Sequence, residues 1–309
     1  MRRLLFSCCV VVCLVICGVA DVAAWTILTT QENPSATETI TLRDIYFISA
    51  TKGWAVGVSS SYGMIYVTAD GGKTWTEQKK TALFDQILSV FFVNETTGWA
   101  AGVASLSKKE VLYKTTDGGA TWNNVSTNLT KGLSKIFFLD EQHGWISGSD
   151  GIVIATTDGG ATWTSQKTAT TKEFLDICFI NETTGWGVGN GSGIQHTTDG
   201  GKTWVVQGSS STAYVWGVHF TDASNGWIVG GGAYFGRTTD GGSSWSITDL
   251  DDFIDLKDVF FTDPNNGWAV GGRSGGSAGG IYATTDGGVT WKKQDIGTNR
   301  DLEGICFYN

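Results

Sequence analysis

The sequence predicts an all-β protein, a propeller of four-stranded blades, on two observations. The first is an octapeptide of the form Thr-x-Asp-Gly-Gly-x-x-Trp that occurs six times, starting at residues 68, 115, 156, 197, 238 and 284. The second is a Gly-Trp pair that recurs at intervals of 41 to 46 residues, with tryptophans Trp54, Trp99, Trp145, Trp186, Trp227 and Trp268. A period of about 40–45 residues with room for four strands is typical of a propeller blade.

The octapeptide predicts the hairpin before the outer strand of each blade. Asp-Gly favours a type I′ turn, because both central positions of that turn need positive φ. The Asp carboxylate can accept hydrogen bonds from the amides of its own turn, and the Trp can return into the interior as an apolar anchor. We therefore expect structural roles for Asp70, Asp117, Asp158, Asp199, Asp240, Asp286, Trp75, Trp122, Trp163, Trp204, Trp245 and Trp291. They should lie away from the central channel.

The inner strand of each blade is predicted from the short apolar run before each Gly-Trp. The runs are Ile45-Tyr46-Phe47, Val90-Phe91-Phe92, Ile136-Phe137-Phe138, Ile177-Cys178-Phe179, Val218-His219-Phe220 and Val259-Phe260-Phe261. Consecutive apolar residues indicate a strand that is buried on both faces, as a blade between two neighbours must be.

One propeller domain is expected over residues 25–309, after the segment 1–24. Its repeats span about 42–82, 87–126, 133–167, 174–208, 215–249 and 256–295. The segment 25–31 resembles an outer strand and 302–309 an inner strand, so the termini would share a partial seventh blade in a seven-bladed design. Such closure removes exposed sheet edges. The two middle strands of that blade are missing, which predicts either a C-terminal truncation or a degenerate pairing; the number of blades in the closed ring stays open.

The octapeptide, for example Thr284 to Trp291, resembles the Asp box, or neuraminidase repeat, S/T-x-D-x-G-x-T-W. The extended unit, in which Gly267-Trp268-Ala269-Val270-Gly271 leads to this box, resembles the photosystem II assembly and stability factors of photosynthetic organisms. The resemblance covers nearly all of residues 42–309. It implies a propeller without enzymatic activity that holds an immature membrane-protein segment on one face of the ring.

The N-terminus indicates export. Arg2 and Arg3 precede an apolar run from Leu4 to Ala20, and small residues follow at Ala23-Ala24, which is typical of a secretory signal peptide over 1–24. An uncleaved membrane anchor and a lipoprotein modified at Cys17 are the alternatives. The expected location is extracellular, periplasmic or lumenal.

Two cysteines remain after this segment, Cys178 and Cys306. Both occupy the middle position of an inner-strand run, so we expect buried thiols and no disulfide.

The repeats differ mainly in their loops, and the loops of one face are the predicted working surface. These are the loops between blades and the loops between the second and third strands: Lys79–Gln86, Asn123–Gly132, Thr168–Glu173, Gly208–Tyr214, Thr248–Asp255, Ile296–Asp301, Ser59–Gly63, Ser105–Glu110 and Arg273–Gly279. The candidate binding residues on these loops, or directly before the inner strand that follows, are Phe84, Phe174, Tyr214, Phe253, Asp251, Asp252 and Asp255. For the four aromatic residues, capping of the blade core is the alternative role; for the acidic ones, a merely solvated surface. Glycosylation sequons begin at Asn94, Asn124, Asn128, Asn181 and Asn190.

Several classes of function are not supported by the sequence. The arginines after residue 24 are Arg43, Arg237, Arg273 and Arg300, and no F/Y-R-I-P segment provides the arginine cluster of a sialidase. His143, His196 and His219 lack metal-ligand spacing, so no metal and no cofactor are expected. A net charge of −9 and a pI near 4.8 argue against binding of nucleic acid.

The sequence therefore predicts a monomeric, non-enzymatic scaffold that binds a protein partner, such as an immature membrane-protein segment. One alternative is a secreted surface or adhesion module that binds glycans or proteins. A further alternative is a glycoside hydrolase that uses two carboxylates among Asp251, Asp252, Asp255, Asp301 and Glu303.

Overall fold

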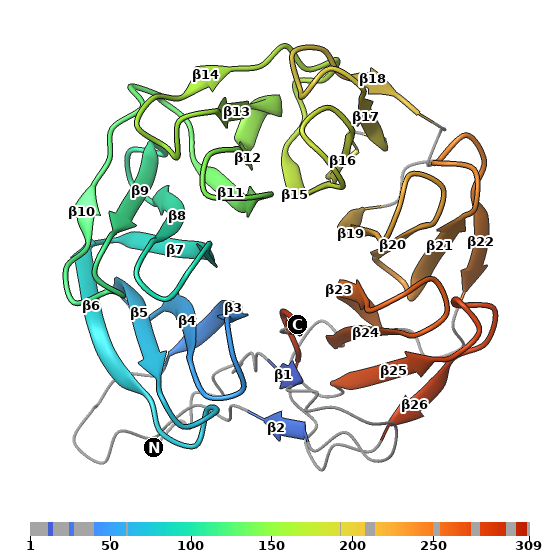
Figure 1. Ribbon diagram of the computed structural model, residues 1–309, viewed down its shortest axis with the longest axis horizontal. Helices are drawn as coiled ribbons and strands as arrows, with labels where there is room; N and C mark the ends of the chain where they lie inside the picture. Colours follow the sequence, from blue (N-terminus) through green and yellow to red (C-terminus); the bar gives the residue numbers. More distant parts are fainter. Residues whose placement is uncertain are drawn as a thin grey trace, which may run out of the picture.

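The computed structural model describes residues 12–14, 25–27, 40–59, 61–191, 193–207, 214–249, 254–272, 279–294 and 301–307. These ranges form six four-stranded antiparallel sheets and one two-stranded sheet. Figure 1 shows the six large sheets as blades in a ring, in sequence order. The described ranges contain no helix of the length and apolarity that a membrane span requires. The prediction of an all-β propeller is confirmed.

Each blade runs from an inner strand beside the axis to an outer strand at the rim (Figure 1). The strands of blades one to three are β3 (Thr41–Phe47), β4 (Gly53–Val58), β5 (Tyr62–Thr68), β6 (Thr76–Leu83); β7 (Asp85–Phe92), β8 (Gly98–Ala104), β9 (Glu110–Thr115), β10 (Asn123–Asn124); β11 (Leu133–Phe138), β12 (Gly144–Gly148), β13 (Val153–Thr156) and β14 (Thr164–Ser165). A short 3-10 turn, η1 (Ser149–Gly151), connects β12 to β13.

The remaining blades repeat this order. Their strands are β15 (Phe174–Phe179), β16 (Gly185–Gly189), β17 (Gln195–Thr197), β18 (Val205–Val206); β19 (Val215–Phe220), β20 (Gly226–Gly230), β21 (Tyr234–Thr238), β22 (Ser246–Asp249); β23 (Asp255–Phe261), β24 (Gly267–Gly272), β25 (Gly280–Thr284) and β26 (Lys292–Gln294).

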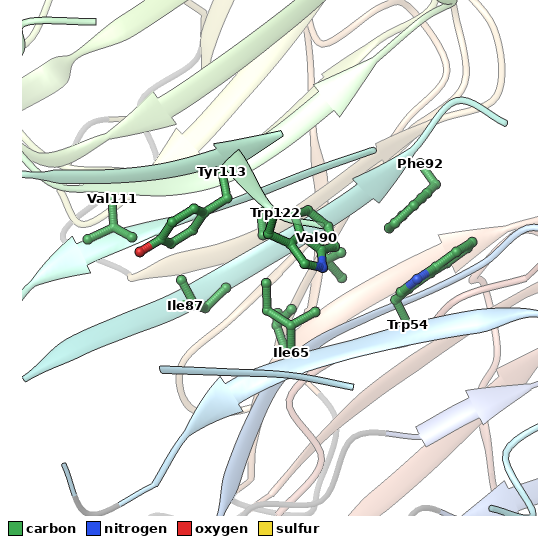
Figure 2. Packing of buried hydrophobic residues seen from close by; sticks show 10 residues of the cluster. Trp54, Ile65, Ile87, Val90, Phe92, Val111, Tyr113 and Trp122 are labelled. Carbon is green, nitrogen blue, oxygen red and sulfur yellow. The ribbon is translucent and has the colours of Figure 1, made fainter. Parts of the chain in front are cut away.

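A stacked Trp–Phe pair joins each of the first five blades to the next. The tryptophan of the Gly-Trp strand lies flat on the last phenylalanine of the next inner strand, with ring centroids 3.4–3.9 Å apart, in the pairs Trp54–Phe92, Trp99–Phe138, Trp145–Phe179, Trp186–Phe220 and Trp227–Phe261. Figure 2 shows the Trp54 and Phe92 rings in this arrangement. The tryptophans are at most 2% exposed, so these rings form the apolar contact between neighbouring blades.

The same tryptophans also donate hydrogen bonds to the next blade. The indole Nε1–H reaches the first glycine carbonyl of the next Asp box, from Trp54 to Gly118 (3.3 Å), Trp145 to Gly200 (2.9 Å), Trp186 to Gly241 (3.2 Å) and Trp227 to Gly287 (2.8 Å). Trp99 differs, because Lys114 Nζ donates to the corresponding carbonyl of Gly159 at 2.7 Å. The buried Trp99 Nε1 has no hydrogen-bond partner among the described residues.

The Asp boxes lie on the rim, and their aspartates bond within their own hairpins. In the third blade, Asp158 Oδ1 accepts the Thr162 amide (2.9 Å) and Oδ2 accepts the Thr162 hydroxyl (2.6 Å). The Thr156 hydroxyl donates to Asp158 Oδ1 (2.8 Å) and accepts the Gly160 amide (2.8 Å). The hydroxyl and amide of Thr162 lower the pKa of Asp158 to about 2. Both glycines of this box have positive φ, 65° and 75°, as the turn requires.

The place of a seventh inner strand is taken by residues 301–307. The Ile305 amide donates to Asp258 Oδ2 of the sixth blade (2.9 Å), and Cys306 Sγ accepts the Phe47 amide of the first blade (3.3 Å). The Phe307 ring lies 4.5 Å from that of Trp268, so it continues the Trp–Phe series. Figure 1 shows the C-terminus between the first and sixth blades. This arrangement is consistent with a seven-bladed design.

Strand β1 (Val12–Leu14) pairs antiparallel with β2 (Trp25–Ile27). The first lies within the segment predicted as a signal peptide, and the second within the predicted partial blade. Cleavage and export stay predictions.

The two types of tryptophan contact predict different costs for the same substitution. Trp227→Phe keeps an aromatic ring on Phe261 but leaves the Gly287 carbonyl without its donor, whereas Trp99→Phe removes an indole that has no described acceptor. We expect Trp227→Phe to lower the free energy of unfolding by about 1 kcal/mol more than Trp99→Phe does. Urea denaturation of both variants measures this difference, and equal losses would contradict a stabilising role for the inter-blade hydrogen bond.

Candidate functional site

A cavity of about 510 Å³ lies on the axis of the ring. It is lined by the inner strands of all six blades and by the C-terminal segment. Each inner strand has a β-bulge against the second strand at the same position of the repeat, between Leu42 and Asp44 in the first blade and between Leu256 and Asp258 in the sixth. A bulge redirects the neighbouring side chains. The residue after it, here called the axial residue, directly precedes the apolar run: Asp44, Ser89, Lys135, Asp176, Gly217 and Asp258, with Gly304 in the C-terminal segment.

The axial residues form a charged layer at this level of the channel. Lys135 Nζ lies 3.3 Å from Asp44 Oδ1, although the two residues come from the third and first blades. Asp44 Oδ2 also accepts the Ser89 hydroxyl (2.8 Å) and the Val90 amide (3.0 Å) of the second blade. Asp176 and Asp258 accept amides of the following blade or segment, from Val218 (2.8 Å) and Ile305 (2.9 Å). The layer therefore connects blades that are distant in sequence.

Burial and mutual charge shift the pKa values of this layer. Burial opposes the ammonium charge of Lys135, but the carboxylates of Asp44, Asp258 and Asp176 outweigh it and raise the pKa of Lys135 above its ordinary value. Burial raises the pKa of Asp176 against the opposing effect of Lys135. Burial likewise raises the pKa of Asp258 to about 7, with a further contribution from the charge of Asp176.

Beyond the charged layer, the channel wall is mostly aromatic. Tyr46 and Phe91 contact each other with ring centroids 4.5 Å apart, and His219 and Phe260 with 4.6 Å. Burial lowers the pKa of His219 to about 4, and its Nε2–H donates to the Phe261 carbonyl at 3.0 Å, so this histidine is neutral. Cys178 and Cys306 occupy the same slot as buried thiols, as expected, and neither forms a disulfide with a described residue.

The structure separates the candidate residues of the loop face. Phe84 and Tyr214 are exposed, by 42% and 52% of their surface. Phe174 does not lie on this face: it is fully buried and packs edge-to-face against Trp204, so its assignment as a binding residue is corrected to a core residue. It is the first residue of an inner strand, where the other blades have a buried aliphatic residue. Phe253, Asp251 and Asp252 lie outside the described residues.

The described carboxylates of the proposed hydrolase pair have partners within the fold. Asp255 Oδ1 accepts the Gly232 amide (3.1 Å), and its Oδ2 lies 3.9 Å from Lys257 Nζ. Glu303 Oε2 lies 3.7 Å from Arg43 Nη1. Asp301 is buried. No pair of these carboxylates stands out as an acid and a base.

One potential metal-ligand group spans two neighbouring blades. Donor atoms of Asp140, His143 and Glu182 all lie within 4.8 Å of one another. Asp140 is also the first residue of the turn between the first and second strands of the third blade. Its Oδ1 accepts the amides of Gln142 and His143 in that turn, both at 2.7 Å. Sequence spacing could not indicate the group, because Glu182 belongs to the next repeat.

Two of the predicted glycosylation sites occupy that same turn position. Asn94 Oδ1 accepts the Thr96 and Thr97 amides, at 2.9 and 2.8 Å, and Asn181 Oδ1 does the same for Thr183 and Thr184. These asparagines replace the aspartate of other repeats, so the turn explains their presence. Asn124 lies on β10, Asn128 has a positive φ of 60°, and Asn190 bridges to Tyr214. Glycosylation stays a prediction.

The charged layer predicts an unusual dependence of stability on pH. The pKa of Asp258 in the folded state, about 7, lies above its unfolded value, so its contribution is largest below about pH 4 and is lost as pH rises to 7. This loss is at most on the order of 4 kcal/mol, an upper bound because the cavity is open to water. Asp158 and four other box aspartates have pKa values near 2, so their contribution is present above about pH 4 and is lost toward pH 2.

Thermal unfolding across pH 2–9 should therefore show maximal stability on the acidic side of neutrality. Asp258→Asn should flatten the decline between pH 5 and 8 and leave the decline below pH 4 unchanged. A decline between pH 5 and 8 that is as steep in Asp258→Asn as in the parent would contradict the role of Asp258.

Lys135 should contribute far more to stability than an exposed lysine that also pairs with one aspartate. Lys135→Met leaves the axial carboxylates without their cation, which we expect to cost about 3 kcal/mol at pH 8 and less at pH 5, where Asp176 and Asp258, whose pKa values are raised by burial, take up protons. The control is Lys131→Met, which breaks an exposed pair with Asp150 and should cost less than about 1 kcal/mol. Chemical denaturation at both pH values measures both variants; equal losses, or a loss from Lys135→Met that does not depend on pH, would contradict this role.

Comparison with known proteins identifies the family. The family model described as photosynthesis system II assembly factor YCF48 matches residues 19–131 and 120–207, which together are more than half of the chain. A search of curated proteins gave no match.

Solved structures confirm the fold. A structure described as YCF48 bound to D1 peptide is 23% identical, with a TM-score of 0.66 over 85% of this chain and 84% of that one. YCF48 from Cyanidioschyzon merolae is 22% identical, with a TM-score of 0.64 over 86% and 88% of the two chains. An ancestral GH74 enzyme is 15% identical, with a TM-score of 0.61 over 83% of this chain but 38% of its own. From the family match, the chain belongs to the family of the photosynthesis system II assembly factor YCF48.

Proposed function

We propose that this protein is a non-enzymatic propeller that binds a segment of a partner protein and acts as an assembly factor. The family match carries the proposal. The solved relative described with a D1 peptide supports a peptide as the class of ligand. A rigid ring with variable loops on one face suits this task, because function on a repeat scaffold resides in the loops.

The geometry supports binding rather than catalysis. Asp255 and Glu303, the half-buried carboxylates proposed for a hydrolase, are occupied by Lys257, Arg43 and the Gly232 amide. The charged axial residues bond to one another and to inner-strand amides, which is a structural use of these groups. The similarity to the GH74 enzyme spans 38% of that enzyme and concerns the fold.

We further propose that the protein works on the exported side of a membrane, after removal of residues 1–24. The basic residues Arg2 and Arg3 before an apolar run and the small residues Ala23-Ala24 support this. Mass spectrometry of the mature N-terminus tests it, and an intact Met1 in the mature protein would argue against it.

Binding of a labelled D1 peptide, followed by fluorescence anisotropy, tests the proposed function. We expect saturable binding to the purified protein and no binding of the same peptide in scrambled order. Equal binding of the two peptides would contradict a peptide-specific site. Hydrolysis of a β-glucan or sialoside substrate would contradict the non-enzymatic assignment.

A further inference from the structure

Three large apolar side chains are exposed together where the first and second blades meet. Leu83, Phe84 and Leu106 are exposed by 53%, 42% and 77%. The Ser105 amide donates to the Phe84 carbonyl (2.8 Å), and the Phe84 amide donates to the Ser61 carbonyl (2.6 Å), so the turn after β6 lies beside the loop between β8 and β9. Other exposed apolar residues, such as Val205 and Val206, lie on outer strands.

The backbone at this place is strained. Phe84 and Lys108 have φ values of 67° and 59°, in the left-handed region that bulky side chains disfavour. The burial of Phe84 is only partial, because 42% of its surface stays exposed. A strained, exposed aromatic residue is a reason to ask what the surface binds.

The loop beside the apolar residues is basic and borders a pocket. Lys108 and Lys109 are exposed, and neither forms an ion pair with a residue in the described ranges. Lys109 lines a pocket of about 350 Å³ whose wall also includes Asn124, Asn128 and Leu129. Glu110 lines it too, but its carboxylate accepts the amide (3.0 Å) and the hydroxyl of Thr127 and so holds the pocket wall in place.

We propose that this blade-two surface, formed by Leu83, Phe84, Leu106, Lys108, Lys109 and the adjoining pocket, docks a partner segment in which carboxylates flank large apolar side chains. The proposal rests on the proposed function and names where the partner binds and what chemistry it carries. The apolar side chains of the segment cover Leu83, Phe84 and Leu106, and its carboxylates pair with Lys108 and Lys109. Charge complementarity favours this partner, because Lys108 and Lys109 are exposed cations that form no ion pair with a described residue, on a protein whose net charge is −9.

The test uses two labelled twelve-residue peptides that contain the same leucines, flanked by glutamates in one and by lysines in the other. The protein is made in bacterial cytoplasm, because glycans on Asn124 or Asn128 would occupy the pocket. We expect the glutamate peptide to bind more tightly, and its affinity to fall as salt is raised. Preference for the lysine peptide, or no preference, would overturn the proposal.

Variants locate the binding. The double change Lys108→Glu and Lys109→Glu should weaken binding of the glutamate peptide by at least about tenfold, and Leu106→Ser should also weaken it. The matched controls are Lys202→Glu and Val205→Ser, which alter an exposed lysine of an Asp box and an exposed valine on β18. All four variants should melt at the parent temperature. Equal weakening by the controls would overturn the assignment of the surface.

Two further outcomes keep this proposal separate from the proposed function. If the D1 peptide binds but the blade-two variants bind it as tightly as the parent, the surface is wrong and the function stands. If the glutamate peptide binds at this surface and the D1 peptide does not bind, the surface stands and the partner of the proposed function is wrong.

A lipid surface is the other occupant that the experiments distinguish. The parent protein would then bind phosphatidylglycerol vesicles but not the glutamate peptide, and the double lysine variant would lose the binding to vesicles. This result would overturn the proposal.

Discussion

The amides that face the axis set the constraint on which the ring depends. An inner strand is the edge of its sheet, so these amides have no neighbouring strand to accept their hydrogen bonds. The axial residues supply the acceptors for Ile45, Val90, Ile136, Ile177, Val218, Val259 and Ile305. Asp44, Asp176 and Asp258 each serve two amides, their own neighbour and that of the next blade. Around the ring, the axial residue before each of these aspartates has no side-chain acceptor for an amide. These residues are Gly304 before Asp44, Lys135 before Asp176, and Gly217 before Asp258.

This constraint explains the charge at the centre of an otherwise apolar core. Three aspartates are needed as double acceptors, and three carboxylates at one level of the channel would repel one another. Lys135 supplies the opposing charge, since its ammonium lies 3.3 Å from Asp44 Oδ1. The cluster thus closes the ring, including the C-terminal segment through Ile305. The polar groups of this cluster bond to one another and to inner-strand amides, so their role is structural. The loops are therefore the better candidates for the binding site.

The repeat made the fold predictable, and departures from the repeat limited the prediction of the site. Six copies of the octapeptide and regular Gly-Trp pairs were sufficient to predict the blades and their hairpins, whereas the Asp-box tryptophans expected inside are mostly only partly buried. Phe174 was misassigned because an aromatic residue at a loop boundary resembles a binding residue, whereas the strand already begins there. The axial residues were missed, although each directly precedes an apolar run. Their partners lie in other blades, and residue spacing within one repeat cannot reveal a contact such as that between Asp44 and Lys135, 91 positions apart.

The stability of the repeated scaffold is what permits a strained loop at its surface. Phe84 keeps its left-handed conformation because its amide and carbonyl are both held, by Ser61 of one hairpin and Ser105 of the next. The Trp54–Phe92 stack and the Trp54 hydrogen bond to Gly118 hold the first and second blades together. The free-energy cost of the unfavourable φ of Phe84 is therefore offset by contacts elsewhere in these two blades. A propeller of this kind can therefore keep an apolar side chain in solvent and offer it, with Lys108 and Lys109 beside it, to a partner.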